Sequence, residues 1–257
     1  MDEKMTRILC IASAKGGVGK TTFVANLASA LARAGKSVIA VDANLTTSNL
    51  GMHLGIPMYP TTLQDVLKGR ARVKDALYYH PAGFRVLPAD ISLKKLMLPR
   101  SSELMDVFYK ISGNADFILI DTAAGLGKEA QSAIEAADEV ITVTNPELPA
   151  MTDALKVIRI ADKYETKHLG VIVNRVRHER GEPGLDEIES FLDAPVLGHV
   201  HEDNNVRASI RQKNPVVLHR PNSAASRQFR QIAAKLMGEE ASAADVSILQ
   251  RLFGWLG

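Results

Sequence analysis

The sequence has little of what marks several protein classes. It contains a single cysteine, Cys10, in 257 residues, which excludes an internal disulfide and fits a reducing cytoplasm. Iron–sulfur clusters need several thiolate ligands, so a role in electron transfer or cluster assembly lacks the residues it requires. We interpret Cys10, within the apolar run RILCIASA, as a small buried hydrophobe.

Long apolar runs and a strong net charge are also missing. No run approaches the roughly 18 residues that a transmembrane helix needs, and the N-terminal MDEKMTRI lacks a signal-peptide pattern. A net charge of +2, from 31 basic and 29 acidic residues, gives no strong field for nucleic acid. We expect a cytoplasmic protein whose membrane contact is peripheral.

Short apolar segments alternate with helical patterns along most of the chain. Helices are predicted between the strands, for example KTTFVANLASALARAG ending at Gly35 and TDALKVIRIADKYE after breaks at Pro146 and Pro149. The pattern predicts an α/β fold, a doubly wound, mostly parallel sheet of about seven or eight strands with helices on both faces. The strand segments are RILCIAS, SVIAVDA, FRVLPA, DFILIDT, EVITVTN, LGVIVN and PVLGHV.

The stretch SAKGGVGKTT matches the phosphate-binding loop pattern of P-loop NTPases, with Ala14 in place of the usual first glycine. It follows a predicted strand and opens a predicted helix, where backbone N–H groups and the helix N-terminus can surround phosphate oxygens. Lys20 would reach the β- and γ-phosphates of ATP, and the Thr21 hydroxyl would bind Mg²⁺. The predicted nucleotide contacts are Lys15, Gly16, Gly17, Val18, Gly19, Lys20, Thr21 and Thr22.

Asp121 follows the apolar segment FILI. Alone, such an aspartate is often a helix cap. Paired with the phosphate loop, it is predicted to hold Mg²⁺ through Thr21 or water.

The extra lysine in KGGVGKTT resembles the deviant Walker A motif of the MinD/ParA ATPases. VDANLTTSNLG looks like switch I of that family, FILIDTAAGLG like its Walker B and switch II, and GVIVNR like its adenine-reading strand end. The pattern is most similar to the archaeal MinD branch, with the flagellar-number FlhG group close behind. The resemblance implies an ATP-dependent homodimer in which Lys15 reaches the partner's phosphates, so that hydrolysis depends on dimerisation.

The same resemblance assigns further residues to the base. The Asn174 side chain would hydrogen-bond adenine with Arg175 beside it, and His201, Glu202 and Asp203 would lie nearby. Two departures from the family pattern concern catalysis and partners. Asp42 and Asn44 stand where switch I usually has two aspartates, and because an amide cannot accept a proton, we predict slow ATP turnover. An unknown regulator is expected near Asp153, although Leu155 replaces an acidic residue there.

The C-terminal residues divide into a linker and a tail. We predict an ATPase domain over residues 1–237, a flexible linker over 238–245 and an amphipathic helix over 246–257 that binds anionic membranes. The tail resembles the membrane-targeting sequence of MinD, and the alternative is a terminal helix packed on its own domain. The predicted membrane residues are Ile248, Leu249, Leu252, Phe253, Trp255 and Leu256.

Three other functions compete with a membrane-bound switch that positions a cellular structure. A metabolic P-loop kinase would leave Lys15 and the tail without a role, and a metallocluster relative would need more cysteines. The seven histidines are interpreted as surface residues, since His199 and His201 lack companions for a metal site. A ParA-like partition ATPase, although DNA is not the expected partner, would use a basic cluster of Arg207, Arg211, Lys213, Arg220, Arg227 and Arg230.

Overall fold

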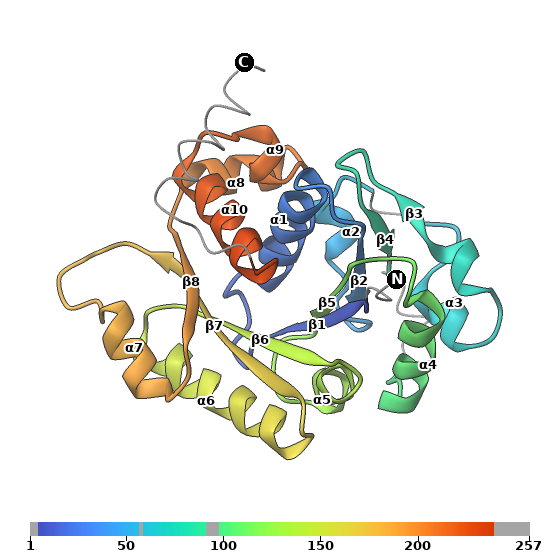
Figure 1. Cartoon of the computed structure of the whole chain (residues 1–257), viewed down its shortest axis with the longest axis horizontal. Coiled ribbons are helices and arrows are strands. Elements are labelled where there is room, and N and C mark those ends of the chain that lie inside the picture. The colour runs from blue at the N-terminus through green and yellow to red at the C-terminus, as the bar shows by residue number, and fades with distance from the viewer. Residues whose placement is uncertain (1–4, 57–58, 91–97, 239–257) are drawn as a thin grey trace.

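Eight strands form one sheet that runs through the molecule (Figure 1). The structure is a computed structural model that describes residues 5–56, 59–90 and 98–238. The strand order is β3-β4-β2-β5-β1-β6-β7-β8, and every pairing is parallel except that of β3 with β4. The strands are β1 Arg7–Ala12, β2 Val38–Ala43, β3 Tyr78–Tyr79, β4 Arg85–Leu87, β5 Phe117–Thr122, β6 Glu139–Thr144, β7 Lys167–Val176 and β8 Val196–His201.

Helices cover both faces of the sheet, as expected for a doubly wound fold. One face carries α1, α8, α9 and α10, and the other carries α5, α6 and α7 (Figure 1). The helices are α1 Lys20–Arg33, α2 Leu50–His53, α3 Leu63–Leu67, α4 Ser101–Ile111, α5 Lys128–Glu135, α6 Leu148–Lys163, α7 Leu185–Leu192, α8 Asn204–Arg211, α9 Val216–His219 and α10 Ala224–Leu236, with a 3-10 turn η1 at Val73–Ala76. In the described ranges, no helix has the length and apolar character needed to cross a membrane.

The central strands are apolar because both of their faces are covered. Every residue of β2, β5 and β6 is buried, which is the property that makes parallel strands read as continuous apolar runs. One core layer packs α1 and α10 against one face of the sheet, around Phe23 and Phe229. A second layer packs α4 and α5 against the other face, around Phe108 and Ile120. The predicted fold is confirmed.

Three details differ from the sequence expectations. The pair Tyr78–Tyr79 forms a short antiparallel edge strand, β3, which lacks the apolar run that predicts the other strands. Helix α6 begins at Leu148 and includes Pro149 in its first turn, where the missing N–H costs nothing, so Pro149 does not break the helix. Helix α1 ends at Arg33, two residues before Gly35, whose φ is +79°.

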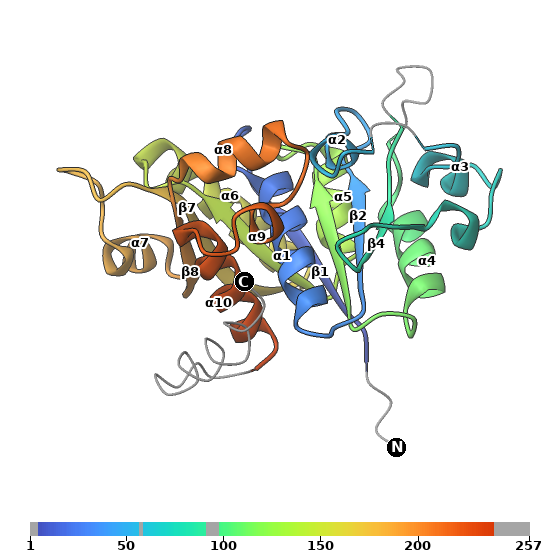
Figure 2. The ribbon, with the colours of Figure 1, turned by 90° about the horizontal axis from the view of Figure 1, so that it is seen from above.

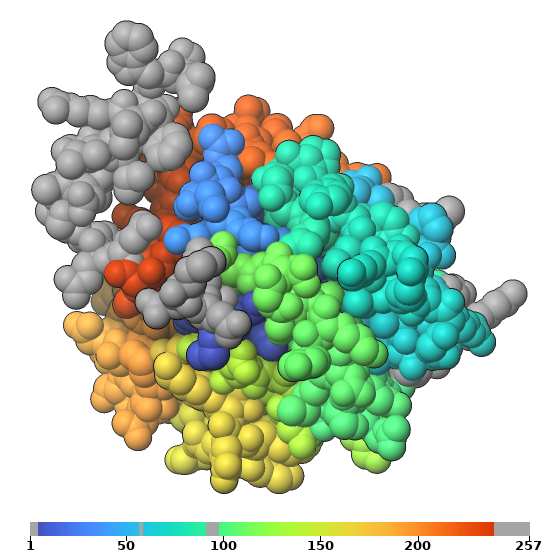
Figure 3. Space-filling model, turned by 45° about the vertical axis from the view of Figure 1, so that its right-hand side comes forward, coloured from blue at the N-terminus to red at the C-terminus, as the bar shows by residue number. Residues whose placement is uncertain are grey.

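The direction of the parallel strands determines which side of the sheet can bind a ligand. In Figure 2 the arrowheads of β2 and β5 point toward the side where α2 and α8 lie. The segments from α3 to α4, cyan to green in Figure 3, form one side of the face that it shows. In parallel sheets of this kind, ligands bind at the carboxyl ends of the strands, at the point where the chain reverses its order. Here that point is β1, which lies between β5 and β6.

Candidate nucleotide-binding site

The phosphate loop occupies the reversal point, between the end of β1 and the start of α1. Gly17 and Gly19 have φ of +77° and +102°, a left-handed backbone that glycine adopts without steric cost. A Cβ on Gly19 would also lie 2.3 Å from Nδ2 of Asn174. The loop conformation therefore requires glycine at position 19, and a Cβ there would also displace the Asn174 amide.

Lys20 lies inside the molecule at this loop. Its residue is 7% exposed, and its Nζ donates to Oγ of Ser13 at 2.9 Å. Burial lowers the pKa of Lys20, and the nearby Asp121 carboxylate raises it. A buried ammonium group is stable when anions surround it. Phosphate oxygens bound at this loop would therefore stabilise the charged form of Lys20.

Asp121 is the group that fits a magnesium ion. It is fully buried, and neither carboxylate oxygen has a hydrogen-bond partner. Burial and the nearby Asp42 charge raise its pKa, the Thr21 hydroxyl and Lys20 lower it, and the net value is about 7. A buried carboxylate without partners is costly, and a hard cation with its water shell would satisfy both oxygens.

The described residues contain no group of three His, Cys, Asp or Glu that could hold a metal. Mg²⁺ in nucleotide sites needs no such group, since it uses one or two protein oxygens together with phosphates and waters.

Asp42 and Asp121 lie side by side, because they are paired in register on β2 and β5. Burial raises the pKa of Asp42 and its hydrogen bonds lower it, which leaves a net value of about 6. The Asp42 carboxylate accepts from Oγ of Ser48 at 2.7 Å and from the backbone N–H groups of Asn44 and Leu50, each at 3.1 Å. It therefore shapes the loop after β2, which resembles switch I.

The Asn44 side chain is used inside the same loop. Its Oδ1 accepts from the backbone N–H and the hydroxyl of Thr47 at 3.1 and 3.0 Å, and its Nδ2 donates to the Thr47 carbonyl at 2.7 Å. In this state its amide faces Thr47. Before the Asn44 amide could orient an attacking water, this loop would have to rearrange.

Glu129 holds this loop from the other side, and no motif in the sequence indicates its role. Its carboxylate accepts from the backbone N–H groups of Leu45 and Thr46, and from the Thr46 hydroxyl at 2.6 Å. Because Glu129 belongs to α5, which follows the loop after Asp121, it connects the two segments that resemble switch I and switch II.

Lys15 differs from Lys20 in its exposure. Its side chain is 38% exposed, and Nζ lies 2.9 Å from Oε2 of Glu147 at the start of α6. The pair lowers the pKa of Glu147. Lys15 is thus at the surface of the phosphate loop, held by its own chain. The ion pair between Glu147 and Lys15 is not predicted from the sequence, because nothing in the sequence connects the start of α6 with the phosphate loop.

A pocket beside the phosphate loop collects the residues predicted to contact adenine. Asn174 at the end of β7 donates from Nδ2 to the Val18 carbonyl at 2.6 Å. The expected residues are joined by Val206 and Ile210, four positions apart on α8, a spacing that signals one helix face. The lining includes Gly19, Thr22, Asn174, Arg175, His201, Glu202, Asp203, Val206, Arg207 and Ile210.

Two of these residues also have structural partners. The Asp203 carboxylate caps α8 by accepting from the backbone N–H of Asn205 at 2.8 Å. Glu202 lies 2.8 Å from NH2 of Arg207, and Arg175 and Arg177 lie near its other oxygen. The acidic side chain of Glu202 therefore faces arginines, which leaves the pocket wall polar on this side.

The histidine interpretation needs correction. His201 has a companion, since its Nε2 lies 2.9 Å from Nε2 of His178, and His199 is 5.0 Å from His201 between ring centroids. The His201 backbone N–H donates to Oε1 of Gln228. The amide nitrogen of Gln228, Nε2, then lies 3.1 Å from Nδ1 of His201. Because that amide donates, Nδ1 is unprotonated and the proton of neutral His201 lies on Nε2. His80 is 8% exposed and so is not a surface residue.

The expected partner surfaces are only partly described. Asp153 pairs with Lys156 at 2.8 Å on the outer side of α6. Within the basic cluster, Arg227 and Arg230 donate to the carbonyls of Asn222 and Pro221. The linker after Gly238 and the predicted membrane residues lie outside the described residues.

Comparisons with known proteins agree with this site. The family described as ParA, NUBPL iron-transfer P-loop NTPase, matches residues 4–237. An uncharacterized ATP-binding protein of Methanocaldococcus jannaschii is 44% identical over 234 residues, 91% of this chain and 89% of that protein. The antiactivator FleN of Pseudomonas aeruginosa is 32% identical over 241 residues, 90% of this chain and 86% of FleN.

A solved structure extends the likeness to a nucleotide complex. The septum site-determining protein MinD of Pyrococcus horikoshii OT3, complexed with Mg-ADP, is 36% identical and has a TM-score of 0.86, with 90% of this chain and 96% of that chain covered. The nucleotide and magnesium of that relative match the chemistry that Lys20, Thr21 and Asp121 offer here.

Proposed function

The chain belongs to the MinD/ParA family of P-loop ATPases, and on this premise we propose that it is a MinD-like switch. ATP drives the formation of a homodimer, the dimer resides on an anionic membrane surface, and hydrolysis to ADP and phosphate releases it. Such a cycle would position the cell division site or another cellular structure. The observation that carries the proposal is the second lysine, Lys15, at the surface of a phosphate loop that already contains the buried Lys20.

The two lysines divide the work at the phosphates. Lys20 holds the β- and γ-phosphates from inside the loop, and Thr21 and Asp121 hold magnesium. The bound ion would neutralise negative charge that develops during phosphoryl transfer. Lys15 leaves Glu147 and reaches the phosphates of a second protomer, where a cation supplied in trans stabilises the transferring group much as an arginine finger does.

Membrane binding rests on residues 246–257. One short amphipathic helix binds a membrane weakly, whereas two copies on one dimer act together through their effective concentration. The nucleotide state would therefore control the time spent on the membrane.

Cosedimentation with anionic liposomes tests this proposal. The full-length chain and a truncation after Asp245 are compared, each with Mg-ATP and with Mg-ADP. We expect only the full-length protein with ATP to pellet, and Phe253→Glu should behave like the truncation. If nothing pellets under any condition, the membrane proposal is wrong.

Two alternatives have weaker support. A role like that of FleN, an antiactivator, would use the same ATPase cycle with a different partner. A ParA-like DNA-binding role would need free cations, but Arg207 pairs with Glu202 and two other arginines of the basic cluster bind carbonyl groups. A DNA mobility shift that weakens steeply with salt would support that role. Iron transfer has no thiolate set, because the only cysteine, Cys10, is buried in β1.

A further inference from the structure

Helix α2 connects two sides of the candidate nucleotide site. It begins at Leu50, whose backbone N–H donates to the Asp42 carboxylate at 3.1 Å. It ends at His53, and Nε2 of His53 lies 3.4 Å from the Thr22 hydroxyl oxygen on α1. Asp42 lies beside Asp121, the residue that fits a magnesium ion, whereas Thr22 lines the pocket beside the phosphate loop. A helix of four residues therefore contacts both the loop that resembles switch I and the phosphate side of the site.

Apolar packing holds the body of α2 against the domain. Leu50 and Leu54 are buried and belong to the same core layer as the apolar face of α1. Gly51 lies close to the turn that follows, since a Cβ at this position would come within 2.6 Å of the Ile56 carbonyl oxygen. With its middle fixed in this way, the polar contacts at the two ends of α2 determine how firmly the preceding loop is held.

The hydrogen bonds of the His53 ring identify its protonated nitrogen. Nδ1 lies 3.0 Å from the Asn49 carbonyl oxygen, and because a carbonyl oxygen only accepts, Nδ1 carries a proton. Burial lowers the pKa of His53 more than this hydrogen bond raises it, so the neutral ring with one proton is favoured. Nε2 is then an acceptor, and the Thr22 hydroxyl donates to it.

The Thr22 hydroxyl has a single proton to donate. Because Thr22 lines the pocket beside the phosphate loop, an oxygen of a bound nucleotide phosphate is a second acceptor for that proton. An ionised oxygen accepts a stronger hydrogen bond than a neutral group does, and the 3.4 Å contact with His53 is longer than an ideal hydrogen bond. The phosphate and His53 therefore compete for one proton, and the phosphate is the stronger acceptor.

We propose that His53 is a positioning residue that holds the Thr22 hydroxyl until a phosphate of the bound nucleotide takes its proton. The hydrogen bond between Thr22 and His53 then breaks, and the end of α2 loses its polar contact with α1. This change loosens the loop before α2, which would have to rearrange before the Asn44 amide could orient water. The inference rests on the nucleotide site of the proposed switch, and it needs neither the dimer nor the membrane.

Calorimetry of Mg-ADP binding to the full-length protein tests the competition. The wild type must break the contact with His53 before Thr22 can donate to phosphate, and His53→Ala removes this cost. One net hydrogen bond changes an equilibrium by about two- to tenfold, and since this contact is long, we expect about two- to fivefold tighter ADP binding. The gain should persist in combination with Thr22→Ser, which keeps a hydroxyl, and disappear in combination with Thr22→Val, which has none.

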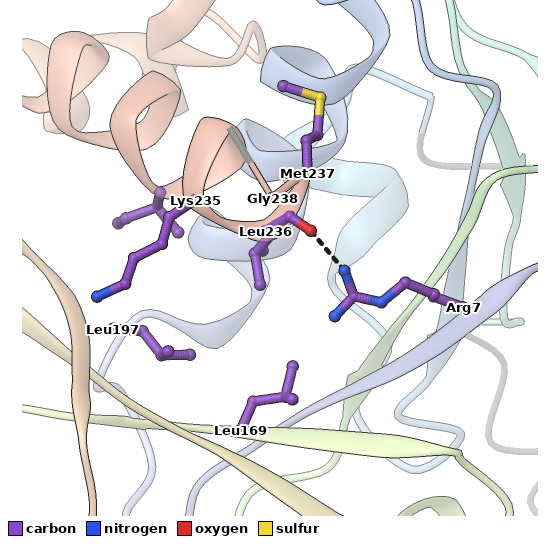
Figure 4. Close-up of a pocket in the computed structure, with 8 residues that line it drawn as sticks. Arg7, Leu169, Leu197, Lys235, Leu236, Met237 and Gly238 are labelled. Carbon is purple, nitrogen blue, oxygen red and sulfur yellow. Dashed lines mark hydrogen bonds between the residues drawn. The ribbon is translucent and has the colours of Figure 1, made fainter. Parts of the chain in front are cut away.

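The chain offers a matched control in His168. Its Nε2 lies 3.0 Å from the Thr142 hydroxyl oxygen, so it makes the same kind of contact as His53, and burial lowers its pKa as well. His168 is at the amino end of β7, beside Leu169, which lines a groove under the end of α10 (Figure 4). This end of the sheet is opposite the nucleotide site, so His168→Ala should leave the ADP affinity unchanged.

Amide hydrogen exchange, followed by mass spectrometry, measures whether the end of α2 is released. The N–H groups of His53 and Leu54 donate to the carbonyls of Asn49 and Leu50. In the wild type we expect Mg-ADP to speed the exchange of residues 50–54. In Thr22→Val the same amides should already exchange fast without nucleotide, and Mg-ADP should add no further change.

Three results would each overturn the inference. His53→Ala could bind ADP no more tightly than the wild type, the gain could persist with Thr22→Val, or Mg-ADP could slow exchange in α2 of the wild type. If the wild type binds no Mg-ADP, the proposed switch and this inference are both wrong. If ADP binds but no form of the protein pellets with liposomes, the membrane proposal alone fails, because none of these measurements uses lipid.

Discussion

Glu129 makes a sharp stability prediction, because one carboxylate holds the loop after β2. It accepts from the backbone N–H groups of Leu45 and Thr46 and from the Thr46 hydroxyl, and it is 7% exposed. In Glu129→Ala, water can reach the exposed Thr46, but Leu45 is 1% exposed and its N–H loses its partner. An orphaned buried donor costs about 1–3 kcal/mol. With the small cavity added, we expect a loss of about 2–4 kcal/mol in the free energy of unfolding.

The matched variant is Glu129→Gln, which keeps an acceptor oxygen for the N–H groups of Leu45 and Thr46. We expect it to lose less than about 1.5 kcal/mol. Urea unfolding of the nucleotide-free protein, followed by circular dichroism, measures both losses. In Glu129→Ala, limited proteolysis should also cut faster within residues 44–50. The reasoning is refuted if Glu129→Ala lies within about 0.5 kcal/mol of the wild type, or if the two variants lose equal stability.

Three further predictions concern turnover, dimerisation and pH. Asn44→Asp should raise steady-state ATP turnover at least about twofold, since a carboxylate can accept a proton and cannot donate to the Thr47 carbonyl; a smaller rise in a phosphate-release assay contradicts this. Lys15→Ala should lower ATP turnover at least about a hundredfold, while calorimetry should find the ADP affinity nearly unchanged. If the variant loses ADP binding, Lys15 contacts the nucleotide of its own chain instead. Burial and the charge of His178 lower the pKa of His201, so its neutral form favours folding, and this contribution is lost as pH falls below about 6.5. His201→Asn, which keeps an acceptor for Gln228, should therefore lose less thermal stability than the wild type between pH 7.5 and 5.5, and parallel melting curves would contradict the assignment.

Much of the fold could be predicted because its signals are local. Apolar runs such as FILI identify β5, and the glycines of the phosphate loop identify the turn after β1. The edge strand β3 could not be predicted, since two tyrosines become a strand only by pairing with β4. The contacts of Glu129 and Glu147 are likewise invisible in the sequence, because each joins groups more than 80 positions apart. The family resemblance assigns Asn174 to adenine, and its hydrogen bond to Val18 of the phosphate loop, which spans 156 positions, is not visible in the sequence.

The buried carboxylate of Asp121 lowers the stability of the folded protein when no ion is bound. It has no hydrogen-bond partner, and its pKa has a net value of about 7, raised mainly by burial. The folded state therefore holds a proton that the unfolded chain releases near pH 4. The resulting penalty grows as pH rises from about 4 to about 7 and is complete above that.

Asp121→Asn removes this penalty, because a neutral amide has the same shape without the charge. Without nucleotide, the variant should therefore be more stable than the wild type at pH 8, by about 1–4 kcal/mol, and the gain should vanish near pH 4. Magnesium reverses the order, since the carboxylate is then its ligand: Mg-ATP should raise the melting temperature of the wild type far more than that of Asp121→Asn. Melting curves at pH 8 with ATP, with and without magnesium, measure this. If Asp121→Asn is less stable than the wild type without nucleotide, the carboxylate has a structural partner and is not a vacant ion ligand. If the two proteins gain equally from magnesium, the ion binds elsewhere.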